Sequence, residues 1–108
     1  MAHGLVERVR VLHLDSKNRL ISDELMWEGT IDQSAVHVRE LMRRGLELGS
    51  AALILVHNHP SGDPSPSRQD IALTREIATA GKPLGILVHD HVVIGSTGHA
   101  SLRALGLI

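Results

Sequence analysis

A short apolar run that leads directly into histidines and prolines constrains the fold of this chain most strongly. Residues 51–56 are uninterrupted apolar residues, and a run of this kind predicts a strand buried on both faces. His57-Asn58-His59-Pro60 follows at once, and prolines and turn formers crowd the chain as far as Pro66. Neither a strand nor a helix continues easily through such a segment. The sequence therefore places two histidines where a central strand ends and a stiff loop begins.

Hydrophobic periodicity predicts the remaining elements. Strands are expected over residues 6–15, 20–27, 84–95 and 99–101, and the first of these directs Val9, Val11 and His13 to one face. Helices are expected over residues 38–48 and 67–80, after a connection at 29–34 that carries helix-capping residues. Their packing stripes are Val38, Leu41, Met42, Gly45 and Leu46 in the first, and Ile71, Leu73, Thr74, Ile77 and Ala78 in the second. The tail from Leu102 is expected to pack on the core. The pattern predicts one α/β domain over residues 1–108, a mixed sheet flanked by helices.

Composition excludes several classes of function. The 108 residues carry a net charge of -1, so no basic field is present to hold nucleic acid or an anionic membrane non-specifically. Trp27 is the only aromatic residue, which argues against a base-stacking surface. Cysteine is absent, and any metal must be held by nitrogen and oxygen ligands. No leader peptide or membrane span is recognisable in the sequence, and a cytoplasmic protein is expected.

Three residues in the middle of the chain have the spacing of a divalent-metal site. His57 and His59 alternate with one residue between them, and strand geometry directs both imidazoles to the same face. Asp70 lies eleven residues after His59, in the first turn of the next helix. Two nitrogens, one carboxylate and a fourth position left for water are typical of a catalytic zinc site. The sequence predicts Zn²⁺ bound by His57, His59 and Asp70.

Structural interpretations of the same residues stay open. A histidine pair near a turn is often without function, and Asp70 completes a helix capping box that begins at Ser67. The contiguous letters His-Asn-His do not indicate an HNH nuclease, in which these residues are scattered over a ββα unit. The other histidines are treated as ordinary residues or, for His91, as a residue of local structure or an orienting partner of a metal ligand; they are His3, His13, His37, His89, His91 and His99.

The same segment resembles a known family motif. The pattern H-x-H-P at residues 57–60, with seven residues between His59 and Ser67 and then S-x-x-D ending at Asp70, is similar to the JAMM motif of the JAB/MPN metallopeptidases. The full string from His57 to Asp70 looks like the form found in the RadC family. Further RadC-like landmarks are residues 29–30, 36–40 and 90–95, although Val38 stands where proline is usual.

The resemblance implies a cytidine-deaminase-like α/β fold and zinc held by His57, His59 and Asp70 together with water. It also implies a glutamate that handles the proton, and Glu7 is the matching position. Glu28 and Glu40 are its rivals. Ser67 is expected to cap its helix and to help hold a developing oxyanion.

Three functions follow from the resemblance. The first is a zinc-dependent hydrolase of a peptide or isopeptide bond, acting on a protein or peptide that the sequence does not name. The second is a DNA-repair accessory module, which the balanced charge disfavours for direct DNA binding. The third is a non-catalytic scaffold, which the intact ligand set disfavours. RadC proteins generally carry a helix-hairpin-helix region before this domain, so the chain is expected to be an excised domain or a naturally short member.

Overall fold

The fold is a five-stranded mixed sheet with two helices packed on it. A computed structural model describes residues 6–29 and 34–108, with the side chains of 34–36 also left undescribed, so His3 and part of the expected 29–34 connection lie outside the described residues. The elements are β1 (Arg8–Leu14), β2 (Leu20–Glu28), α1 (Ser34–Leu48), β3 (Ala52–Asn58), α2 (Arg68–Gly81), a short 3₁₀ turn (Lys82–Leu84), β4 (Leu87–Gly95) and β5 (Gly98–Ser101). The expected α/β class is confirmed.

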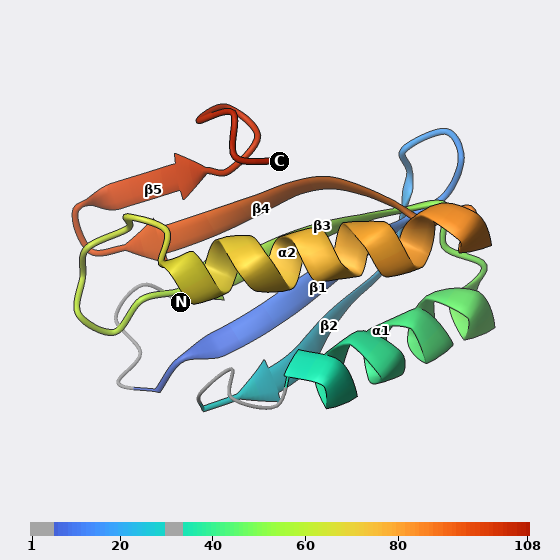
Figure 1. The fold of residues 1–108 in the computed structure, drawn as a ribbon, viewed down its shortest axis with the longest axis horizontal. Helices are drawn as coiled ribbons and strands as arrows, with labels where there is room; N and C mark the ends of the chain where they lie inside the picture. The colour runs from blue at the N-terminus through green and yellow to red at the C-terminus, as the bar shows by residue number, and fades with distance from the viewer. Residues whose placement is uncertain (1–5, 30–33) are drawn as a thin grey trace.

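Strand order places β3 at the centre of the sheet. The order is β2-β1-β3-β4-β5, with β3 and β4 parallel and the other pairs antiparallel. Helix α2 forms the crossover between the parallel strands, as a parallel pair requires. The loop that leaves β3 therefore turns back directly into the start of α2 (Figure 1), which brings the end of β3 and the first turn of α2 together.

Both helices cover the same face of the sheet (Figure 1). The core lies between them and the sheet, and it includes Val9 and Val11 of β1, Leu53 and Leu55 of β3, and Leu41 of α1. The prediction that β3 is buried on both faces is wrong in this respect, because Ile54 and Val56 are only half-buried. Alternating residues of β3 point away from the helices, and no helix among the described residues covers that face.

Helix α1 begins at Ser34, four residues before its expected start. The sequence stripe locates Leu41 and Met42 correctly in the core, but Leu46 is 56 % exposed. Gly45, the preceding residue of the stripe, is buried and lies close to Ile86 of the core, so Leu46 alone extends to solvent at the edge of this face. Gly49 ends the helix with a φ of +70°. The exposed side chain of Leu46 is a departure that periodicity alone does not reveal.

Helix α2 has the capping box expected from its sequence. The Ser67 hydroxyl accepts a hydrogen bond from the Asp70 backbone N–H, and the Asp70 carboxylate accepts one from the Ser67 N–H. Strand β4 begins at Leu87 and not at residue 84, because the 3₁₀ turn and Gly85, with a φ of +73°, occupy the intervening residues. Leu102 and Ile108 of the C-terminal tail pack on the core as expected.

Gly95 at the end of β4 permits a close approach between backbones. A Cβ atom added there would lie 2.1 Å from the carbonyl oxygen of Gly62, in the loop that follows β3. The absence of a side chain at Gly95 therefore lets this loop lie against the end of the sheet.

Within the described part of the chain, no helix is both long and apolar enough to cross a membrane.

Candidate metal centre

Two histidines meet at the carboxyl end of β3. His57 is the second-last residue of β3 and is completely buried, whereas His59 follows the strand and is partly exposed. Their ring centroids are 5.0 Å apart in an edge-on arrangement. His59 donates from Nδ1 to the carbonyl oxygen of Asp63 at 3.0 Å, which fixes the orientation of this ring. The alternation read from the sequence therefore brings the two imidazoles together as expected.

The carboxylate of Asp70 contacts both imidazoles. Oδ2 of Asp70 lies 3.0 Å from Nε2 of His59, and Oδ1 lies 3.0 Å from Nδ1 of His57. The second pair is close enough for an ion pair, but its atoms are not aligned for a hydrogen bond. Oδ2 also accepts the Ser67 backbone N–H at 2.8 Å. Capping the helix and facing the histidines are thus simultaneous roles of this buried side chain.

Glu7 reaches the same cluster from the start of β1. Its Oε1 atom is 2.6 Å from Nε2 of His57. The two rival glutamates lie elsewhere: Glu28 pairs with Arg8 at 3.0 Å, and Glu40 pairs with Arg43 at 2.7 Å on the surface of α1. Among the three glutamates considered from the sequence, the structure places Glu7 at the histidines.

His91 is a further member of the cluster. It is buried on β4, and its ring centroid is 5.6 Å from that of His57. The Thr74 hydroxyl lies 2.6 Å from the Asp70 carbonyl oxygen and 2.6 Å from Nδ1 of His91. A carbonyl oxygen only accepts, so the single hydroxyl proton goes to Asp70 and Nδ1 of His91 must donate. Nε2 of His91 then carries a lone pair, and it has no hydrogen-bond partner among the described residues.

Burial and charge set the protonation states of this cluster. Burial lowers the pKa of His57, but the carboxylates of Asp70 and Glu7 outweigh it and raise this pKa above its ordinary value. Burial raises the pKa of Asp70, yet the contacts from His57 and Ser67 leave it well below its usual range. Burial, with the neighbouring charge of His57, lowers the pKa of His91 to about 4. Asp70 is therefore ionised and His91 neutral at pH 7.

The donor set fits a divalent metal. Two groupings have candidate ligand atoms that all lie within 4.8 Å of one another: Glu7 with His57 and His59, and His57 with Asp70 and His91. His59 uses Nδ1–H on a backbone carbonyl, as metal-binding histidines usually do, so a neutral ring directs the lone pair of Nε2 at the Asp70 carboxylate. The Nε2 lone pair and the carboxylate are both acceptors, so a proton or a cation must lie between them. Imidazole nitrogens with a carboxylate suit zinc and related ions.

Ser67 lies beside the cluster at the start of α2. Its hydroxyl oxygen accepts the Asp70 backbone N–H at 3.0 Å, and the side chain is exposed. A hydroxyl that accepts one hydrogen bond keeps its own proton available for donation. Ser67 can therefore cap the helix and donate to an oxygen atom outside the protein.

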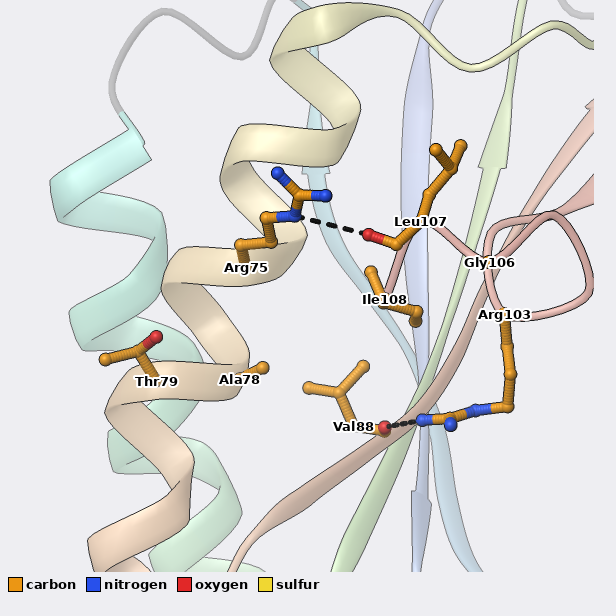
Figure 2. Close-up of a pocket in the computed structure, with 8 residues that line it drawn as sticks. All are labelled: Arg75, Ala78, Thr79, Val88, Arg103, Gly106, Leu107 and Ile108. Atoms are coloured by element: carbon orange, nitrogen blue, oxygen red, sulfur yellow. Dashed lines mark hydrogen bonds between the residues drawn. The ribbon is translucent and has the colours of Figure 1, made fainter.

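A hollow elsewhere in the molecule contains none of the metal-binding candidates. It has a volume of about 510 Å³ and lies between α2, β4 and the C-terminal tail (Figure 2). Arg75 and Arg103 are among its lining residues, and their guanidinium groups donate to the backbone carbonyls of Leu107 and Val88. The candidate metal centre at the end of β3 therefore lies apart from this hollow.

Sequence reasoning underestimated His91 and missed Thr74 and Asn58. Thr74 belongs to the predicted packing stripe of α2, but a threonine one turn after Asp70 can also bond back to its carbonyl. Asn58 enters the motif only as the residue between two histidines, but its buried side chain binds the segment around Glu7. A polar residue inside an otherwise apolar strand is the signal that could have identified it.

Comparison with known protein families finds a match that spans almost the entire chain. The sequence model of the family described as RadC-like JAB domain matches residues 1–107. The matched region includes every residue of the cluster described above. This agrees with the resemblance carried by the motif at residues 57–70.

Proposed function

The chain belongs to the RadC-like JAB domain family, and from this premise we propose that it is a zinc-dependent hydrolase that cleaves a peptide or isopeptide bond. The JAB fold is compatible with a hydrolase, and the residues at the end of β3 offer the donors and the carboxylate that such a reaction needs. His57, His59 and Asp70 are the residues that would hold zinc. Glu7 and Ser67 are the residues that would act on water and substrate.

One observation carries this proposal: a carboxylate from the residue just before β1 and a carboxylate from α2 converge on the same histidine. Glu7 lies 2.6 Å from Nε2 of His57, and Asp70 lies 3.0 Å from Nδ1 of the same ring. Asp70 is buried and serves the donor set, whereas Glu7 is 27 % exposed and can meet solvent and substrate. Two carboxylates in different environments are suited to two different tasks.

The chemistry divides among the residues as follows. When bound, zinc would supply Lewis acidity, which polarises a substrate carbonyl and makes water more acidic. Glu7 would accept the proton of the attacking water and return it to the leaving amine, as a general base and then a general acid. The Ser67 hydroxyl would donate to the oxygen on which negative charge develops. Asp70 would stay ionised, because its contacts hold its pKa well below the usual range even though burial opposes this.

The test is a cleavage screen with matched variants. The zinc-loaded protein is incubated with a library of peptides and lysine-linked isopeptides, and the products are identified by mass spectrometry. Glu7→Gln should keep its zinc and lose turnover by about a hundredfold to ten-thousandfold, the range of general acid–base catalysis. Glu40→Gln is the matched control, since Glu40 pairs with Arg43 on the surface of α1, away from the histidines and from the segment around Glu7. Full activity in Glu7→Gln, or no cleavage by zinc-loaded protein, would contradict the proposal.

A further inference from the structure

Asn58 separates the two candidate metal-binding histidines, and its buried side chain makes two hydrogen bonds to the chain where β1 begins. Its Oδ1 atom accepts the backbone N–H of Arg8 at 2.6 Å, and its Nδ2 atom donates to the carbonyl oxygen of Val6 at 3.0 Å. If the amide were turned by 180°, Nδ2 would face the N–H of Arg8 and Oδ1 would face the carbonyl oxygen of Val6, so neither hydrogen bond could form. The side chain therefore has one satisfied orientation.

These two bonds take the place of a strand ladder that ends at this point. The pairing of β1 with β3 runs as far as Val9 opposite His57 and does not include Asn58. On its other side β3 stays paired with β4 as far as Asn58, which lies opposite Ile94. Beyond His57, the Asn58 amide provides the partner that a backbone peptide of β3 would otherwise provide for the start of β1.

The residue held between the two bonds is Glu7. Val6 O and Arg8 N flank it on the edge that faces β3, and on the opposite edge the Glu7 carbonyl oxygen accepts the N–H of Gly29 at 2.8 Å. Gly29 has a φ of +91°, a conformation that glycine adopts without strain. The backbone of Glu7 is thus fixed from both edges, and its carboxylate is left to reach His57.

We infer that Asn58 is a positioning residue that holds the Glu7 carboxylate at the metal centre, so one side chain links the histidine pair to the proposed acid–base group. This inference rests on the proposed function for its catalytic consequence, although the clamp itself is a property of the folded chain. A displacement of about 1 Å in a reacting group can lower a rate by about a hundredfold. Loss of the clamp should therefore reduce turnover without removing the ligands.

The structural test needs no substrate. Amide hydrogen exchange of Arg8 and the nuclear Overhauser contact between the Glu7 methylene protons and the His57 ring are measured by NMR on the zinc-loaded protein. Asn58→Leu should speed Arg8 exchange by about tenfold or more and abolish the contact. Asn58→Asp keeps an acceptor for Arg8 and should restore its protection, but it offers no donor to Val6. Ser50→Ala, which removes a buried hydroxyl bonded to His13, is the control and should leave both signals unchanged.

The outcomes separate the inference from the proposed function. Unprotected Arg8 exchange in the wild type, or an unchanged Glu7–His57 contact in Asn58→Leu, would overturn the inference whether or not the protein cleaves anything. Where a cleaved peptide is found, Asn58→Leu should lower kcat by about a hundredfold with KM unchanged. The double variant with Glu7→Gln should be no slower than Glu7→Gln alone, since both changes remove the same contribution. Additive losses would mean that Asn58 does not act through Glu7.

Discussion

Glu7 and His57 are fifty positions apart in the sequence, and Oε1 of Glu7 lies 2.6 Å from Nε2 of His57. The antiparallel pairing of β1 with β3 creates this contact, because it sets Val9 directly opposite His57. Glu7 precedes Val9 by two residues, so in extended chain its side chain points to the same face of the sheet as that of Val9. The candidate centre is therefore assembled by strand register, and changes that disturb neighbouring elements should be felt there.

Replacement of His91 should weaken metal binding although His91 is not among the residues proposed to hold zinc. Its neutral ring bonds the Thr74 hydroxyl, which in turn donates to the carbonyl oxygen of Asp70, and it lies against His57, so it helps to orient these ligands. Loss of a partner that orients metal ligands typically costs about tenfold to a hundredfold in affinity. Zinc dissociation constants of wild type and His91→Gln, measured by chelator competition, check this. His89→Gln is the control, since His89 bonds the Asn18 side chain, and equal affinities for wild type and His91→Gln would contradict the expectation.

Ser67→Ala should destabilise the protein through loss of the helix cap. The Ser67 hydroxyl accepts the Asp70 backbone N–H, and removal of such a cap costs about 1 kcal/mol. Urea unfolding at saturating zinc measures the change. Ser67→Thr keeps the hydroxyl and should lose less, and Ser65→Ala in the exposed loop should be close to neutral. A Ser67→Ala variant as stable as the wild type would show that the cap contributes nothing.

Gly95→Ala should disturb the loop that carries His59. The added Cβ atom would lie 2.1 Å from the Gly62 carbonyl oxygen and 2.7 Å from its carbon, and both are backbone atoms that cannot turn aside. Overpacking of this kind costs about 1–3 kcal/mol. Denaturant unfolding gives the loss of stability, and the chemical shifts of the His59 ring report the displaced loop. The neighbouring change Ser96→Ala adds no atoms and serves as the comparison; identical spectra for Gly95→Ala and wild type would refute the close approach.

Acid should remove the contribution of Glu24 to stability. Hydrogen bonds from Arg44 outweigh the opposing effect of burial and, with Ser22, lower the pKa of Glu24 to about 2. Because the folded-state pKa lies below the ordinary value of 4.5, the contribution is complete above that pH and is lost as the pH falls toward 2. The pair is partly exposed, so the effect is about 1 kcal/mol or less. The stability difference between wild type and Glu24→Gln should therefore shrink between pH 5 and pH 2, and a constant difference would contradict this account.

Local sequence signals located a large part of the fold and the two segments that meet at the candidate site. The apolar run before His57 identified the central strand, and the capping box placed Asp70 in the first turn of α2. Both conclusions depend on contacts within a few residues, for which periodicity and capping rules are direct physical descriptions. The family resemblance, and not the spacing, singled out Glu7.

Long-range contacts account for what the sequence did not reveal. The roles of Asn58 and His91 depend on partners in β1 and α2, which become neighbours only when the sheet forms. The helices lie on one face, so residues such as Ile54 and Val56 are half-buried in a strand that reads as wholly apolar. Leu46 matches the helical period but is exposed at the edge of the face that α1 packs on the core. Hydrophobic periodicity predicts the face on which a side chain lies, but it does not predict which element packs against that face.

The central claim is that His57, His59 and Asp70 hold a zinc ion, and metal content of the purified protein tests it most directly. Elemental analysis after dialysis against trace zinc should give about one zinc ion per chain. The variants His57→Ala, His59→Ala and Asp70→Ala should each lose it, whereas Glu7→Gln and His89→Gln should retain it. A folded wild-type protein that takes up no zinc, or an Asp70→Ala variant that binds zinc as tightly as the wild type, would contradict the account.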